Sequence, residues 1–182
     1  IQQANVLVGC QGLIGQDDRR YAMAILNTVL GGGMSSRLFQ EIREKRGLAY
    51  SVYSFNQGYS DGAYFGLYAG CSPAKTTEVT RLMLEEFTKL ANDGITADEL
   101  ELAKGNINGG LALKFESTQA RMSRLVGTEL VNGEFYDLDA TIEQFNAVTG
   151  EQVRELAADL ITRQRSIVGV GDITEAAFEE FL

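Results

Sequence analysis

Two neighbouring runs with strand periodicity constrain the fold of this chain more than any other feature of its sequence. In the second run, Gly62–Cys71, the residues Ala, Phe, Leu and Ala alternate with Tyr, Gly, Tyr and Gly, which is the period-two pattern of a sheet. The first run, Ala49–Gln57, also reads as a strand, and the turn-forming cluster Gly58–Gly62 separates the two. The pair is therefore predicted to form an antiparallel hairpin.

Most of the remaining chain has helical spacing. The predicted order is β-α-α-β-β-α-α-α-α-β, with Thr141–Val148 as one further short helix. Hairpin strands followed by clustered helices predict an α+β fold, in which helices pack on one face of a mostly antiparallel sheet. The length suits a single domain over residues 1–182. The other predicted elements are the strands Ala4–Gly9 and Ser166–Gly171 and the helices Arg19–Leu30, Ser35–Lys45, Pro73–Asn92, Thr96–Phe115, Met122–Leu130 and Thr149–Ile161.

Several residues predict where helices begin and end. Thr96 with Glu99, and Thr149 with Gln152, have the spacing of capping boxes. A serine, Ser35 or Ser36, is expected to cap the short second helix. Glycines are expected to close two helices and to let others approach closely. These are Gly31–Gly33, expected to end the first helix in the left-handed conformation, Gly47, expected to end the second, and Gly105, Gly109 and Gly110, expected at close helix contacts.

The charge distribution excludes several classes of partner. The net charge is −9, and all of it arises in residues 96–182. Nucleic acids and anionic membrane surfaces bind basic footprints, so we expect neither as a partner. The sequence contains no signal peptide and no run of 18 apolar residues, which favours a cytoplasmic chain. The two cysteines, Cys10 and Cys71, are expected to be buried and reduced. A start at Ile1 indicates a processed product or a piece of something larger.

The chain contains no histidine. A Ser-His or Cys-His nucleophile and an imidazole metal ligand are therefore impossible, and no metal-binding cluster is visible. Paired carboxylates such as Glu85-Glu86 and Asp98-Glu99 lie on predicted helices, where water solvates them. Classical acid–base and metal chemistry within this chain are thus not predicted.

One pair of residues remains as candidate chemistry. Arg43 and Tyr50 lie seven residues apart, across a predicted helix-to-strand junction. Arginine presents a planar fork of donors that can hold a carbonyl or carboxylate, and a tyrosine hydroxyl can donate to a developing oxyanion. The residue types alone also fit a solvent-facing arginine at a helix end and a tyrosine packed on a sheet.

The stretch Leu26–Ser54 resembles the C-terminal-domain signature of the pitrilysin and mitochondrial processing peptidase family. Members of that family are zinc endopeptidases with an inverted His-x-x-Glu-His motif. Two similar metallohydrolase-like domains face each other across a chamber. The N-terminal domain carries zinc and the general-base glutamate, whereas the C-terminal domain is zinc-free and supplies an arginine and a tyrosine. The absence of histidine matches the second kind.

The resemblance implies roles for particular residues. Arg43 would hold a backbone carbonyl of the substrate, and Tyr50 would stabilise the tetrahedral intermediate. The triplet Gly31, Gly32 and Gly33 matches a glycine-rich loop that aids substrate recognition in the non-catalytic subunit of the mitochondrial enzyme. A helix end followed by a tight turn is the alternative interpretation of that triplet. The opening strand, Ala4–Gly9, resembles the sheet edge that could receive the peptide as an added strand.

These observations predict the C-terminal half of a larger bacterial zinc metalloendopeptidase. The isolated chain is expected to be inactive and to hold no cofactor, with zinc in the partner domain. The expected partners are a zinc-bearing N-terminal domain or subunit, an unfolded peptide substrate, or a second copy of this chain in a homodimer. The alternatives are a catalytically silent scaffold or assembly subunit of the same fold and a free peptide-binding module.

Overall fold

The computed structural model describes residues 3–132 and 137–181 and contains a four-stranded antiparallel sheet. The strand order is β2-β3-β1-β4, so β1 lies in the centre of the sheet and β2 and β4 form its edges. The hairpin predicted from the period-two pattern is confirmed as β2 paired with β3. The strands are β1 (Ala4–Gln11), β2 (Ala49–Gly58), β3 (Ala63–Cys71) and β4 (Arg165–Val170).

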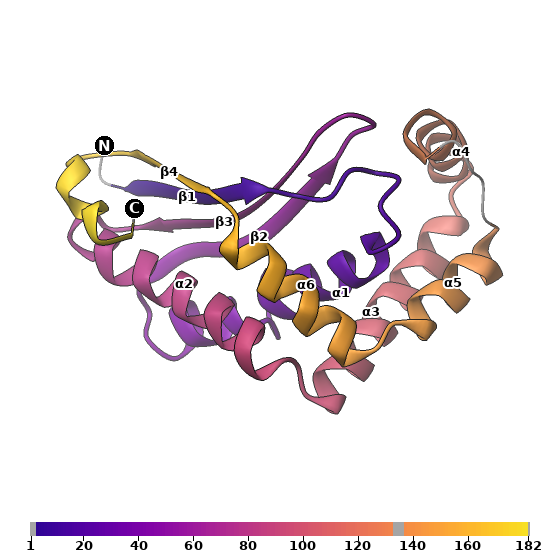
Figure 1. Cartoon of the computed structure of the whole chain (residues 1–182), viewed down its shortest axis with the longest axis horizontal. Helices are drawn as coiled ribbons and strands as arrows, with labels where there is room; N and C mark the ends of the chain where they lie inside the picture. The colour runs from indigo at the N-terminus through magenta and orange to yellow at the C-terminus, as the bar shows by residue number, and fades with distance from the viewer. Residues whose placement is uncertain (1–2, 133–136, 182) are drawn as a thin grey trace.

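Helices cover one face of this sheet, which confirms the predicted α+β architecture (Figure 1). Figure 1 shows α1, α2 and α6 beneath the strands, with α4 standing apart beyond the β2–β3 hairpin. The short segment around Thr141–Val148 is a helix, α5. The helices are α1 (Arg20–Gly31), α2 (Thr76–Asp93), α3 (Ala97–Phe115), α4 (Thr118–Asn132), α5 (Leu138–Ala147), α6 (Gly150–Thr162) and a π-helical segment, Phe39–Glu44.

The hydrophobic core lies between the sheet and the helices. Alternate residues of the two central strands, among them Val6 and Phe65, point to this side and are buried. They meet buried side chains such as Ile25 of α1 and Leu156 of α6, while the rings of Phe65 and Phe87 lie 5.4 Å apart between centroids. The opposite face of the sheet carries no α-helix in the described residues: Figure 1 shows α1, α2, α3, α5 and α6 below the strands and α4 beyond the hairpin.

Both predicted capping boxes are confirmed. The Thr96 hydroxyl accepts a hydrogen bond from the Glu99 amide at 3.1 Å, and the Glu99 carboxylate accepts from the Thr96 amide at 2.8 Å. Thr149 and Gln152 make the same reciprocal pair, at 3.2 and 2.9 Å, at the start of α6. Each box satisfies two amides that have no partner within the helix.

The helix ends at the glycine triplet differ from expectation. The prediction of a left-handed closure there was wrong, since Gly32 has a φ of −82°. The reason for glycine is instead a close approach: a Cβ on Gly31 would lie 2.1 Å from the backbone nitrogen of Ser54 on β2. Gly47, by contrast, has a φ of 62° and ends its helix as predicted.

The segment after the triplet also differs from the prediction. No serine side chain caps it, because the Ser36 hydroxyl donates to the Gly33 carbonyl at 2.6 Å. The turn that follows widens into the π-helical segment Phe39–Glu44 rather than continuing as an α-helix. Periodicity over so few residues does not separate the two helix types.

The outer helices α3 and α4 are less covered than their sequences suggest. Gly105, Gly109 and Gly110 were expected at close helix contacts, but a Cβ on any of them would meet no atom within 4 Å. The apolar stripe of α4 is exposed, and Leu130 reaches 75% exposure. The sequence predicts the existence of α4 correctly, but nothing in the described residues covers its apolar face. The same holds for the other large residues of that stripe, Met122, Leu125 and Val126.

Candidate functional site

Arg43 lies in the widened helical turn Phe39–Glu44. The Lys45 amide donates to the Gln40 carbonyl at 3.0 Å, five residues back, which is the π-helical spacing. The buried side chain of Ile42 anchors this turn in the core. A single π-helical turn is uncommon, and such turns occur frequently at functional sites.

The side chain of Arg43 is exposed and has no acidic partner among the residues that the structure describes. Its guanidinium carbon lies 5.1 Å from the centroid of the Phe39 ring, a cation–π arrangement that leaves the hydrogen-bond donors free. The neighbouring Lys45 and Arg46 both pair with Glu41, and these bonds lower the pKa of that carboxyl. Lys45 and Arg46 are thus occupied by ion pairs with Glu41, whereas Arg43 has no ion-pair partner among the described residues.

Tyr50 occupies a β-bulge at the start of β2. Ala49 pairs with Cys71 and Ser51 pairs with Gly70, so Tyr50 has no opposite residue on β3. Its side chain is 63% exposed, and in the described part of the chain its hydroxyl has no hydrogen-bond partner. Bulges are common beside active sites, where they redirect a side chain.

The backbone brings these two residues to one junction. The Gly47 amide donates to the Arg43 carbonyl at 3.0 Å, and the Leu48 amide donates to the Ile42 carbonyl at 2.9 Å. Tyr50 follows Leu48 by two residues, a span of at most about 7 Å. The structure therefore places Arg43 and Tyr50 at the same helix-to-strand junction, as the sequence predicted. Their roles toward a substrate stay a prediction.

The predicted glycine site divides into two parts. Gly31 is buried against β2, so its lack of a side chain is explained by packing. Gly32 and Gly33 are exposed and line a hollow of about 250 Å³ beside Asn106 of α3. Substrate binding by this loop stays a prediction, and it concerns Gly32 and Gly33 because Gly31 is inaccessible.

The edge of the sheet is not where the sequence predicted it. Ala4–Gly9 was expected to form an edge that could receive a peptide. This was wrong, because β1 pairs with β3 on one side and with β4 on the other. β2 is an edge strand, and its first residues carry the bulge at Tyr50. Strand order depends on where β4 inserts, more than 150 residues after β1, and local periodicity does not encode that.

A partly buried ion pair that the sequence did not indicate lies beside the helical turn. Arg37 donates to both carboxylate oxygens of Glu99, at 2.7 and 2.8 Å, and to the Gly94 carbonyl at 2.9 Å. These bonds, together with the Thr96 amide, lower the pKa of Glu99. The predicted capping box concerned the contact of Glu99 with Thr96 only, and no local signal indicates that Arg37, 62 residues earlier, also binds Glu99.

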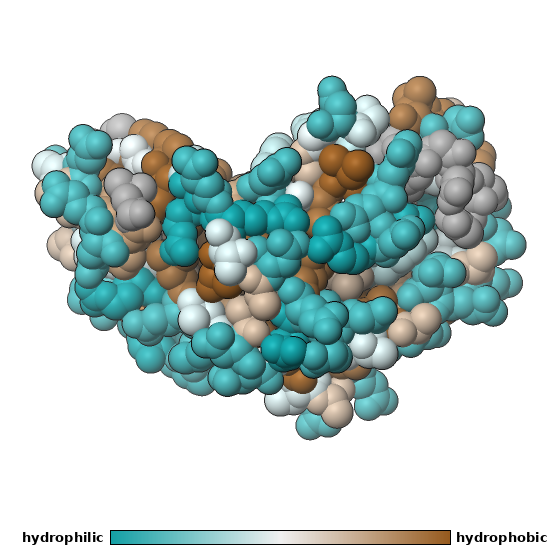
Figure 2. All heavy atoms as spheres, in the orientation of Figure 1, coloured by the Kyte–Doolittle hydropathy of each residue, from teal (hydrophilic) through white to brown (hydrophobic). Residues whose placement is uncertain are grey.

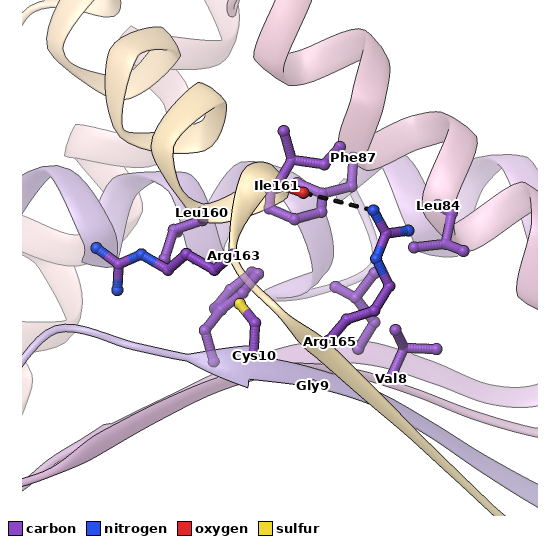
Figure 3. Close-up of a pocket in the computed structure, with 11 residues that line it drawn as sticks. Val8, Gly9, Cys10, Leu84, Phe87, Leu160, Ile161, Arg163 and Arg165 are labelled. Atoms are coloured by element: carbon purple, nitrogen blue, oxygen red, sulfur yellow. Dashed lines mark hydrogen bonds between the residues drawn. The ribbon is translucent and has the colours of Figure 1, made fainter. Parts of the chain in front are cut away.

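A small cavity under the sheet contains Cys10 (Figure 3). It lies between β1, α2 and α6, and Figure 3 shows Arg165 bonded to the Ile161 carbonyl, a contact of 3.4 Å. Burial raises the pKa of the Cys10 thiol, and the nearby Arg163 and Arg165 offset this only in part. Cys10 is half-buried rather than buried, and it is unpaired, as predicted. A protonated thiol in an apolar gap has no catalytic activation.

No group of three or more His, Cys, Asp or Glu residues that could hold a metal ion exists in the described ranges. None of the helices in those ranges is long and apolar enough to cross a bilayer. The two thiols cannot join as ligands, because Cys10 pairs with Phe65, six residues or about 20 Å along β3 from Cys71.

The four-stranded antiparallel sheet with helices packed on one face defines the class of this chain, which is an α+β domain. The family model for the peptidase M16 inactive domain matches residues 1–107. The chain belongs to this family. Homologues with the same domain are zinc proteases, so the resemblance seen in Leu26–Ser54 is confirmed.

Two relatives and one solved structure illustrate the similarity. An uncharacterized zinc protease of Streptomyces coelicolor is 44% identical over 174 residues, covering 96% of this chain and 38% of that protein. The alpha subunit of the mitochondrial processing peptidase of Neurospora crassa is 29% identical, covering 92% of this chain and 32% of the subunit. A peptidase M16 inactive domain from Pseudomonas fluorescens superposes with a TM-score of 0.82 at 24% identity, covering 92% of this chain and 40% of that one.

The chain spans about two fifths of the length of the zinc proteases it matches. The solved structure, being less than 25% identical, shows the fold alone. Activity, substrates and partners of the longer relatives therefore reach this chain only as proposals.

Proposed function

We propose that this chain is the non-metal-binding half of a zinc metalloendopeptidase and that it binds an extended peptide at the junction of Arg43 and Tyr50. The observation that carries the proposal is that neither donor at this junction has a hydrogen-bond partner among the described residues. Both side chains are exposed on unusual backbone, a π-helical turn and a β-bulge, while the neighbouring cations pair with Glu41. Free donors at a helix end beside a sheet edge suit recognition of peptide backbone.

Arg43 would bind the substrate. Its fork of N–H donors can hold a backbone carbonyl next to the cleaved bond, and the Phe39 ring beneath the guanidinium limits its rotation. Binding of this kind affects ground state and transition state together. Removal of the side chain is therefore expected to raise KM more than it lowers kcat.

Tyr50 would stabilise the transition state. Its hydroxyl, free of any protein partner among the described residues, can donate to the oxygen that gains negative charge when the carbonyl becomes tetrahedral. One such donor typically contributes a factor of about 10²–10³ in turnover.

Zinc fits a partner domain rather than this chain. The sequence has no histidine, and no metal-ligating cluster occurs in the residues described by the structure. We therefore assign the metal to a zinc-bearing N-terminal domain or subunit and assign to this chain only the two donors. The isolated chain is inactive in this proposal.

The test uses the complete enzyme, with this chain joined to or mixed with its zinc-bearing partner. Tyr50→Phe should reduce kcat for a fluorogenic peptide about 10²–10³-fold, with little change in the free energy of unfolding. Tyr53→Phe, on the same strand and also exposed, is the matched control and should leave kcat within about twofold. Unchanged turnover in Tyr50→Phe would contradict the assigned role. Absence of cleavage by the wild-type assembly would favour the scaffold interpretation.

A further inference from the structure

The helix-free face of the sheet has a transverse line of small residues. In the register of the strands, Gly9 of β1 lies opposite Gly66 of β3 and Ser166 of β4. On β2, Phe55 lies opposite Gly66 and covers it, since a Cβ on Gly66 would come within 2.5 Å of the Phe55 ring. The Phe55 ring therefore ends this line of small residues at β2, and only small side chains stand along it on β1 and β4.

Larger side chains flank this line on both sides. Two residues earlier on β1, Leu7 lies opposite Tyr68 and Val168. Two residues later, Gln11 lies opposite Tyr64, whose ring meets the Phe55 ring with centroids 5.9 Å apart. Side chains alternate between faces with period two, so both flanking lines stand on the same face as Gly9.

Small residues between large ones produce a hollow of about 530 Å³. Leu7, Gly9, Gln11, Phe55, Tyr64 and Ser166 contribute to its lining. Figure 2 shows the surface dipping between the end of the sheet that carries the chain termini and the end with the β2–β3 hairpin and α4. The volume is in the range of about 300–1,000 Å³ that is usual for ligand pockets.

The chemistry of the hollow selects an uncharged occupant. No Asp, Glu, Lys or Arg lines it, although the protein as a whole has a net charge of −9. Its lining includes the aromatic rings of Phe55 and Tyr64 and the aliphatic Leu7, together with the amide of Gln11 and the hydroxyl of Ser166. A charged side chain would lose hydration here without gaining a partner, whereas an aromatic or branched aliphatic side chain would bury apolar area.

We propose that this hollow is a subsite for a bulky uncharged side chain of the bound peptide, four to six residues from the bond held at Tyr50. The spacing follows from β2, on which Phe55 lies five residues or about 17 Å beyond Tyr50. An extended peptide covers the same distance in the same number of residues. This inference rests on the proposed function, because the occupant is the bound peptide. The peptide would then be selected at two places, the junction of Arg43 and Tyr50 and the hollow.

The first experiment probes the hollow alone. N-acetyl-phenylalaninamide and N-acetyl-alaninamide are titrated into the 182-residue chain, and the amide signals of Gly9 and Ser166 are followed by NMR. The phenylalanine compound should shift both signals saturably and bind at least tenfold more tightly than the alanine compound. Shifts confined to other parts of the protein would overturn the subsite.

A filled variant tests the same point without damaging the fold. In Gly9→Leu the new Cβ would lie 3.4 Å from its nearest neighbours, an ordinary contact, and the side chain would occupy the hollow. Binding of the phenylalanine compound should fall at least tenfold, with an unchanged circular dichroism spectrum. Gly105→Leu adds the same bulk on α3, where a Cβ meets nothing within 4 Å, and should bind as wild type does. Binding by Gly9→Leu within twofold of wild type would refute the subsite.

The second experiment separates this proposal from the function of Arg43 and Tyr50. Decapeptides carrying one phenylalanine at successive positions are cleaved by the complete enzyme, and kcat/KM is measured for each. A maximum at four to six residues from the cleaved bond, abolished in Gly9→Leu and retained in Gly105→Leu, supports the subsite. A flat profile overturns it and leaves the Tyr50→Phe result unaffected. Conversely, Arg43→Ala should not change binding of N-acetyl-phenylalaninamide, so the hollow can stand if the junction proposal fails.

Discussion

Substitution of Gly31 by alanine should destabilise the fold strongly, although the change adds one methyl group. The new Cβ would lie 2.1 Å from the Ser54 nitrogen and 2.8 Å from the Tyr53 carbonyl carbon. Both are backbone atoms of β2, so no side chain can rotate away, and α1 must move off the strand. Overpacking of this kind costs about 1–3 kcal/mol.

A hydrogen bond in the same contact adds to the cost. The Ser54 hydroxyl bonds to the Asn27 side-chain oxygen at 2.8 Å, directly beside the position of the new methyl group. Loss of one such bond contributes about 1 kcal/mol. The total is about 2–4 kcal/mol, which lowers Tm by about 5–15 °C for a domain of this size. Urea unfolding followed by circular dichroism measures the first quantity, and a thermal melt measures the second.

The neighbouring Gly33→Ala provides the control. A Cβ on Gly33 meets no atom within 4 Å, and its φ is not positive, so alanine fits. Its unfolding free energy should stay level or rise by up to about 1 kcal/mol, because alanine restricts the unfolded chain. Equal stability of Gly31→Ala and wild type would refute the packing explanation of the triplet. The substrate-recognition role predicted for that loop would then regain weight.

Three further predictions concern the frame around the junction. Gly47→Ala should lose about 1–2 kcal/mol of stability in urea unfolding, since Gly47 has a φ of 62°; an unchanged midpoint would contradict a strict requirement for the left-handed conformation. Glu99→Gln should lose about 1–3 kcal/mol, because the charged bonds to Arg37 disappear. The folded state lowers the pKa of Glu99 from its ordinary 4.5. The stability difference between wild type and Glu99→Gln should therefore be complete above pH 4.5 and vanish as the pH falls through the lowered pKa, as measured by urea midpoints between pH 2 and 7. A constant difference across this range would argue against the ion pair.

Much of the local structure follows from short stretches of sequence. The β2–β3 hairpin, the two capping boxes and the end of a helix at Gly47 depend on neighbouring residues, so periodicity and turn chemistry suffice to predict them. The junction of Arg43 with Tyr50 is local in the same sense, because seven residues join the two.

Features that depend on distant segments were missed. The central position of β1 requires β4, and the position of Arg37 requires Glu99 on another helix. Exposure of the α4 stripe was also missed, because helical periodicity shows an apolar face but not whether anything packs against it. The π-helical turn and the bulge each contain one residue more than a regular helical turn or strand pair. Helix and strand propensities of single residues do not predict such an insertion.

The bulge at Tyr50 has a consequence for how this protein can change over generations. An extra residue that stands outside the ladder can be replaced without altering the pairing of Ala49 or Ser51 with β3. Substitution at that position is therefore expected to meet little resistance from folding, and under the proposed function only the hydrogen bond to the substrate would favour retention of the phenol. A lineage released from that selection could lose the hydroxyl and keep an intact domain, so descendants that only support assembly need no new architecture.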